Sequence, residues 1–213
     1  MSDIDVQMKV GGQSPSSESD GVMTYPKINL RRELCVIDFF TQMALEGRAY
    51  NITLGTITTP VTGDINLTDA AAEACTDAGT GLTIMPVYLC VDVESVNGGT
   101  LSECAAKGVG AVSSAGTVAV ALPLLIGGSD AMSTSRMNDA GGVTVASELV
   151  TTTRVYFSNR ITAQADFQLA DHYFRVPPTL KGPACFYLQV AGTTAGPTYF
   201  ACYDFIEMRS VNI

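Results

Sequence analysis

The sequence predicts a mainly β protein, folded as a single jelly-roll or β-sandwich domain with one short helix near the N-terminus. After Gly47 the chain is rich in Thr and Val and poor in helix formers, which favours strands. Gly-rich connections such as Asn97-Gly98-Gly99 and Gly127-Gly128 interrupt these segments, and each is followed by a renewed β pattern. Seven or eight strands at this spacing are typical of a sandwich or jelly roll.

The 213 residues divide into an arm and one folded domain. Residues 1–24 contain a polar Gly/Ser-rich stretch at 11–21, which cannot bury enough apolar surface to offset its chain entropy. These residues are therefore predicted to form a flexible N-terminal arm. Residues 25–213 are predicted to form one β-sandwich (jelly-roll) domain, because a chain of this length suits a single compact core.

A helix is expected at residues 30–46. Leu30, Leu34 and Ile37 begin a helical apolar spacing that continues to Ala44. Asn29 could cap its start, and Gly47 could end it in the left-handed conformation that glycine allows.

Seven strands are predicted from β-branched and aromatic composition. They are expected at 48–58, 82–94, 117–126, 143–158, 167–176, 184–190 and 198–208. The last two are expected to pair as a hairpin around the loop at 191–197. Pro86 and Pro123 cannot donate a ladder hydrogen bond, so their strands should lie at an edge or carry a bulge. Residues 69–75, Asp-Ala-Ala-Ala-Glu-Ala-Cys, are expected to form a helical turn.

The composition restricts the function. Charged residues make up 15% of the chain, and arginines outnumber lysines by eight to four. Interface cores are depleted in charge and tolerate Arg better than Lys, so this composition favours a subunit that buries surface against neighbours. The net charge of −9 argues against sequence-independent binding of nucleic acid. No apolar run is long enough for a membrane helix, and no secretory leader is recognised, so synthesis in a host cytoplasm is expected.

No cofactor, metal site or catalytic residue is predicted. The six cysteines, at 35, 75, 90, 104, 185 and 202, contain no C-x-x-C pair, so free thiols are expected rather than zinc ligands. His172 is the single imidazole and is interpreted as structural. Residues 107–110, Lys-Gly-Val-Gly, lack the Gly-Lys-Ser/Thr ending of a phosphate loop and are interpreted as a surface loop. Asp92 and Glu94 should share one strand face, towards solvent rather than calcium.

The predicted arm and helix, followed by Gly47-Arg48-Ala49-Tyr50-Asn51-Ile52-Thr53-Leu54-Gly55-Thr56-Ile57-Thr58-Thr59-Pro60-Val61-Thr62, resemble the jelly-roll coat proteins of icosahedral bacteriophages. The resemblance extends over residues 29–208 and transfers no functional residue. It implies a homo-trimer or homo-pentamer whose arm and loops tie subunits together and to other capsid proteins. The arm carries four acidic residues against Lys9, so we expect it to contact subunits and not the genome.

The expected function is therefore that of a non-enzymatic virion protein, a capsid, penton or decoration subunit that assembles into a shell. The alternative is a receptor-binding or spike-type module of a virion, which would use exposed loops on the same sandwich.

Overall fold

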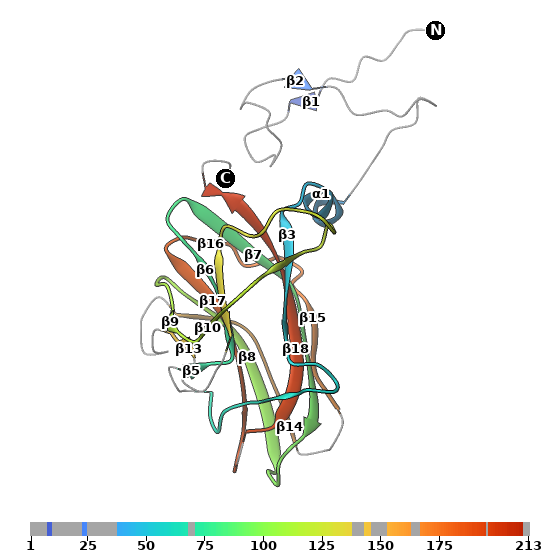
Figure 1. The fold of residues 1–213 in the computed structure, drawn as a ribbon, viewed down its shortest axis with the longest axis vertical. Coiled ribbons are helices and arrows are strands. Elements are labelled where there is room, and N and C mark those ends of the chain that lie inside the picture. The colour runs from blue at the N-terminus through green and yellow to red at the C-terminus, as the bar shows by residue number, and fades with distance from the viewer. Residues whose placement is uncertain are drawn as a thin grey trace, which may run out of the picture.

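The computed structural model describes residues 8–9, 23–24, 38–67, 71–137, 143–145, 153–162, 167–194 and 196–210. These residues are mainly β: two large antiparallel sheets pack on each other around one core (Figure 1). The predicted mainly β class is confirmed. The predicted arm at 1–24 lies outside the described residues, except that β1 (Met8–Lys9) pairs with β2 (Met23–Thr24).

The two large sheets contain six and seven strands. In spatial order the first consists of β10 (Thr117–Ala119), β12 (Thr134–Met137), β6 (Ala74–Ala78), β17 (Ala184–Gly192), β8 (Leu101–Val109) and β14 (Arg154–Thr162). The second consists of β11 (Leu122–Pro123), β3 (Ala49–Leu54), β18 (Thr198–Arg209), β7 (Leu82–Ser95) and β15 (Phe167–Tyr173), with β16 (Leu180–Lys181) paired to β7 and β4 (Val61–Thr62) paired to β18. A three-stranded sheet joins β5 (Ala71–Ala72), β13 (Val143–Thr144) and β9 (Ser114–Ala115).

The core lies between the inner faces of the two large sheets. Alternate residues of β18 point into it, and aromatic rings cross from one sheet to the other. Phe186 of β17 packs edge-on against Tyr203 of β18, with ring centroids 5.3 Å apart. The Tyr203 hydroxyl lies 2.7 Å from the Thr76 hydroxyl on β6, a hydrogen bond that joins the two sheets inside the core.

Helix α1 (Phe39–Leu45) packs against the opposite face of β18 through Met43, which is fully buried beside Ile206 and Met208. Asp38 caps its start by accepting a hydrogen bond from the Thr41 backbone N–H, and the helix ends at Glu46 before Gly47. Gly47 has a φ of 69°, as predicted for a glycine that ends a helix. The helix is shorter than the predicted 30–46, since Asp38 is extended; residues 30–37 and Asn29 lie outside the described residues.

Several predicted strands are present, and Pro86 lies where β18 skips a residue of β7, at the bulge expected there. Pro123 lies on an edge strand, also as predicted. The helical turn predicted at 69–75 is wrong, because 71–72 and 74–78 are strands. All five residues of β6 are buried between two neighbouring strands, so tertiary packing overrides the helical preference of alanine.

The hairpin predicted from 184–190 and 198–208 is also wrong. β17 lies in the six-stranded sheet between β6 and β8, whereas β18 lies in the seven-stranded sheet between β3 and β7. The intervening loop crosses from one sheet to the other, and Gly63 donates a hydrogen bond to the Pro197 carbonyl at 2.9 Å to hold it. The sequence indicates that both segments are strands, but it does not indicate which strands they pair with.

We expect Gly196→Ala to destabilise the fold by about 1 to 3 kcal/mol, because a Cβ there would overlap the backbone carbonyl of Gly63. Urea unfolding of the full chain measures this effect. Gly79→Ala is the matched control, since a Cβ at Gly79 meets no atom within 4 Å. Equal stability of the two variants would contradict the close packing of the crossing loop.

Candidate functional site

The segment 117–126 runs along the edges of both large sheets. It enters as β10, the edge strand of the six-stranded sheet, and leaves as β11, the edge strand of the seven-stranded sheet. Its side chains alternate: Ala119 and Ala121 are buried, while Val118, Val120 and Leu122 are 62%, 65% and 59% exposed. Strand periodicity thus turns every second aliphatic side chain of this edge towards solvent.

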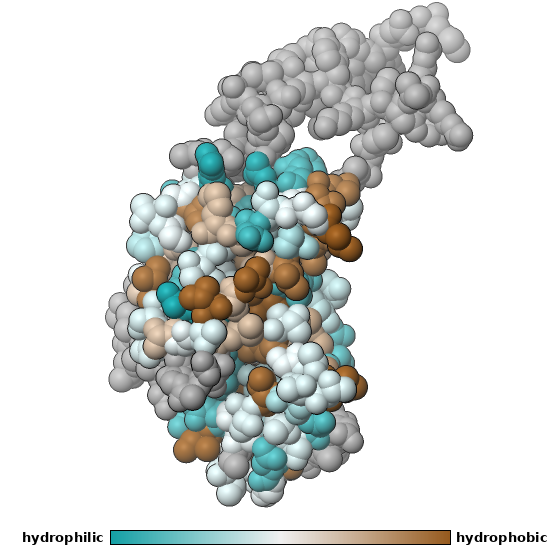
Figure 2. Space-filling model, viewed as in Figure 1, coloured by the Kyte–Doolittle hydropathy of each residue, from teal (hydrophilic) through white to brown (hydrophobic). Residues whose placement is uncertain are grey.

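The exposed aliphatic side chains continue beyond β11. Leu124 and Leu125 are each 40% exposed and Ile126 is 99% exposed, just before a turn in which Gly128 donates to the Leu125 carbonyl. We call this set the apolar stripe: Val118, Val120, Leu122, Leu124, Leu125 and Ile126. Figure 2 shows apolar surface gathered at the centre and upper right of the face along which Figure 1 draws this segment.

The opposite edge of the sandwich carries charged side chains beside two exposed apolar ones, Val155 and Tyr173. There β14 and β15 are the edge strands, and the Asn159 side chain donates to the Leu169 carbonyl to join them. β14 carries Arg154 and Arg160, and Arg160 pairs with Glu103 at 2.6 Å. By contrast, residues 117–128 contain no charged residue. Charged side chains on edge strands prevent unwanted pairing, so the stripe lacks the usual protection of an edge that faces water.

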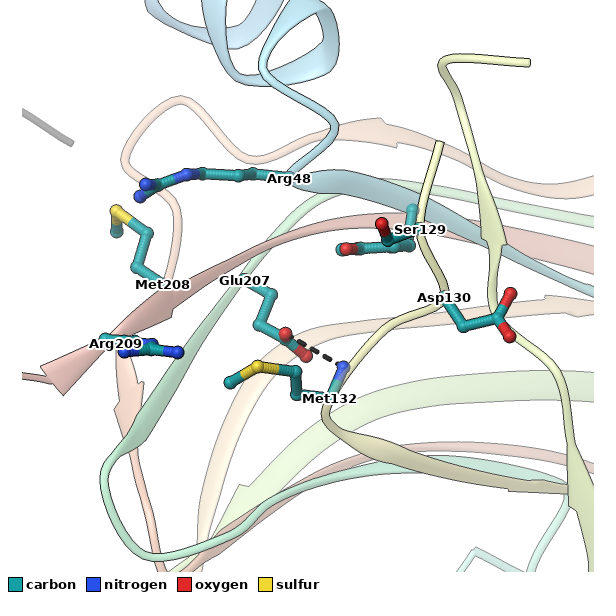
Figure 3. Close-up of a pocket in the computed structure, with 8 residues that line it drawn as sticks. Arg48, Ser129, Asp130, Met132, Glu207, Met208 and Arg209 are labelled. Atoms are coloured by element: carbon teal, nitrogen blue, oxygen red, sulfur yellow. Dashed lines mark hydrogen bonds between the residues drawn. The ribbon is translucent and has the colours of Figure 1, made fainter. Parts of the chain in front are cut away.

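A pocket of about 200 Å³ lies beside the loop that follows the stripe (Figure 3). Its lining is formed by Arg48, Tyr50, Ser129, Asp130, Met132, Glu207, Met208 and Arg209. Figure 3 places Arg48 and Arg209 on one side of it and Asp130 on the other.

Glu207 is the buried carboxylate of this pocket, and its hydrogen bonds are used to hold the loop. It accepts hydrogen bonds from the backbone N–H groups of Met132, at 3.0 Å, and Ser133, at 2.6 Å. Burial, with the nearby Glu207 carboxylate, raises the pKa of Tyr50. The arrangement anchors the loop behind the stripe, and among the lining residues there is no His or Cys that could act as a base or nucleophile.

His172 lies on β15, away from this pocket. Its ring stacks on Phe157, with centroids 4.6 Å apart, and meets the edge of Phe174 at 4.8 Å. Among the described residues no hydrogen bond joins it to a nucleophile or a carboxylate. The structure therefore gives His172 a packing role between two aromatic rings.

The surface loop predicted at 107–110 is wrong. Lys107 and Gly108 lie within β8, and Lys107 is buried. Its ammonium donates to the Leu67 carbonyl at 2.7 Å and to Gln189 Oε1 at 2.6 Å. Burial lowers the pKa of Lys107 to about 8, an effect that the Glu103 charge partly opposes. The glycine that suggested a loop is needed for packing, because a Cβ at Gly108 would meet Tyr156 and Leu180.

The described cysteines are free, as predicted, but two of them lie together. Cys75 and Cys185 are buried within 4.8 Å of Asp77, measured between their ligand atoms. Burial and the neighbouring Cys75 raise the pKa of the Cys185 thiol well above its usual value. Sequence reasoning missed this cluster because Cys75 was assigned to a helical turn at 69–75 and no strand was predicted at Asp77, so their shared strand face was not expected.

Asp92 and Glu94 share the outer face of β7, as their spacing predicted. Glu94 is exposed, and half-buried Asp92 accepts a hydrogen bond from the Cys90 thiol at 3.4 Å. Cys90 stands opposite Cys202 on β18, and both are half-buried.

No protein-family model, curated protein or solved structure matches the chain. No helix among the described residues is long and apolar enough to cross a membrane. The candidate site is therefore identified from its geometry. It is an uncharged apolar edge, and the buried Glu207 carboxylate holds the loop that follows it.

We expect Glu207→Gln to destabilise the protein by about 1.5 to 3 kcal/mol, because the amide replaces a charged acceptor of two backbone hydrogen bonds. Urea unfolding measures the loss, and hydrogen exchange at Met132 and Ser133 should accelerate. The exposed Glu94→Gln is the control, with a change within about 0.5 kcal/mol. Unchanged exchange at these two amides would show that Glu207 does not anchor the loop.

We expect the free energy of unfolding to rise with pH, relative to Lys107→Met, between about pH 8 and 10. In this range the folded chain releases the Lys107 proton, since its pKa is lowered from 10.5 to about 8, while the unfolded chain retains it. Stability therefore increases as pH rises through the folded pKa, and the cost of burying the charge is greatest below it. Urea unfolding of both proteins across the range provides the test, and parallel curves would refute the lowered pKa.

Proposed function

We propose that this chain is a structural, non-enzymatic subunit of a virion, and that it assembles with copies of itself into a particle shell through the apolar stripe. A capsid, penton or decoration subunit with a jelly-roll fold fits this role. The observation that carries the proposal is the uncharged edge at 117–128, with its exposed aliphatic side chains.

In the single chain, this edge exposes aliphatic side chains to water, which is unfavourable. Full burial of a wholly exposed aliphatic side chain contributes about 1.5 to 3 kcal/mol. The six side chains of the stripe are 40% to 99% exposed, so burial in a contact would give a part of this value for most of them. Ordering losses on association consume much of this gain, so one stripe alone suits a contact that is repeated by symmetry. A closed ring of subunits supplies that repetition.

The edge strands add a second contribution. Among the described strands, β10 and β11 each pair with a neighbour on one side only, so both are edge strands at which a partner strand could add. Pro123 removes one backbone donor from β11, which limits open-ended sheet extension. An apolar contact with restricted backbone pairing favours a closed assembly over a fibre.

We expect the doubly substituted Val118→Lys/Val120→Lys chain to remain folded and to lose self-association. Both side chains are exposed in the single chain, so the substitutions leave the core intact but place two charges in the contact. Sedimentation at several concentrations should change from a trimer or pentamer to a monomer. Moderate salt should not dissociate the unmodified assembly, because screening weakens ion pairs more than apolar contact.

Ile57→Lys/Val176→Lys is the matched control, with the same added charge at exposed aliphatic positions outside the stripe. It should assemble like the unmodified chain. If the unmodified chain is a monodisperse monomer with no partner-dependent assembly, the shell proposal fails. A receptor-binding module then becomes the better explanation of the stripe.

A further inference from the structure

Two thiols and a carboxylate meet on the outer face of the six-stranded sheet. Cys75 and Asp77 are two apart on β6 and so share a face, and the register of β17 places Cys185 opposite Asp77. The apolar residues packed beside them include Val109, on β8, and Val143, on β13 of the small three-stranded sheet. The cluster is thus buried between two sheets.

The geometry is close to that of a metal-ligand set. The three ligand atoms all lie within 4.8 Å of one another. In a tetrahedral zinc site, sulfur and oxygen ligands stand about 3.5 to 3.8 Å apart, given the usual zinc–ligand bond lengths. Side-chain adjustments of about 1 Å would bring these three ligands to three corners of the tetrahedron, and a small ligand such as water would take the fourth.

Ser113 lies beside the same atoms. Its hydroxyl is 3.0 Å from Cys75 Sγ, from which it accepts, and it donates to Asp77 Oδ2 at 2.6 Å. Its backbone N–H donates to Asp77 Oδ1 at 2.8 Å, so Ser113 fixes the orientation of the carboxylate through both oxygens. A hydrogen bond of this kind to a ligating carboxylate is what stabilises the orientation of metal ligands.

We propose that Cys75, Asp77 and Cys185 bind one divalent transition-metal ion of the zinc class. Two thiolates select borderline-soft ions over magnesium and calcium, which prefer oxygen ligands alone. On binding, the two S–H bonds break, two metal–sulfur bonds form, and two protons pass to solvent. The Arg136 guanidinium, whose Nε is 3.7 Å from Asp77 Oδ2, and the ion together balance the three negative charges.

The ion's role is structural, because its ligands join β6 to β17 at the centre of the six-stranded sheet. Ser113 also ties the end of β8 to this point through Asp77. Val118 of the stripe stands opposite Arg136, and Arg136 stands opposite Cys75, so the site lies two strands in from the stripe on the same outer face of the sheet.

The test uses the full chain, reduced and freed of metal, and titrated with Zn²⁺ and Co²⁺. We expect one ion per chain, a thiolate-to-cobalt charge-transfer band, and alkylation of Cys75 and Cys185 in the unmodified protein that is slower with zinc than without it. Cys185→Ser and Asp77→Asn should each weaken zinc binding by at least about tenfold. Cys90→Ser/Cys202→Ser removes the half-buried thiol pair of the other sheet and should bind zinc unchanged.

Three results would overturn the proposal. The first is the absence of stoichiometric zinc binding by the reduced chain at micromolar concentration. The second is a cobalt complex without the thiolate band, or without protection of Cys75 and Cys185. The third is a freshly purified protein in which Cys75 and Cys185 form a disulfide and no metal binds. Because protection and the cobalt band are measured on the unmodified chain, misfolding of a variant cannot obscure the result.

Discussion

The inner faces of the two large sheets bury each other, and the other features depend on that contact. Phe186, Tyr203 and Phe205 bring large rings to the centre, where Phe186 meets Tyr203 edge-on and Tyr203 lies tilted against Phe205. The buried hydroxyl of Tyr203 forms a hydrogen bond with Thr76 of the other sheet. This bond offsets the cost of burying a polar group and links the two sheets. The loop between β17 and β18 crosses from one sheet to the other past Gly63, which donates a hydrogen bond to the Pro197 carbonyl.

Two packed sheets have exposed edge strands, and the two edges of this sandwich differ in the side chains that they carry. On one side the edge strands β14 and β15 lie together with arginines beside them. On the other, a single segment passes from β10 to β11 and presents aliphatic side chains. Glu207 holds the loop behind that segment from the end of β18. A surface that costs free energy in water is thereby kept rigid, which suits a contact that must form repeatedly in one geometry.

Local patterns predicted the elements that depend on local chemistry. The β-branched and aromatic composition of 82–94 and 198–208 identified β7 and β18, and both prolines lie, as expected, on strands with a bulge or at an edge. The segment 117–126 was predicted as one strand, and its alternation, together with the lack of charge, was the available sign of the stripe. The pattern failed at β6 and β8, where alanine, glycine and a buried lysine imitate a helix or a loop.

The sequence by itself determined the mainly β class, the position of the glycine that ends α1 and the alternation that exposes the stripe, because each follows from residues near one another in the chain. Only the tertiary structure decided that β17 and β18 belong to different sheets and that Cys185 meets Cys75 and Asp77. The strand pairing joins residues more than a hundred positions apart. Every residue type offers nearly the same backbone hydrogen-bonding groups, so these groups do not specify which strand pairs with which. That choice follows from the joint burial of both sheets.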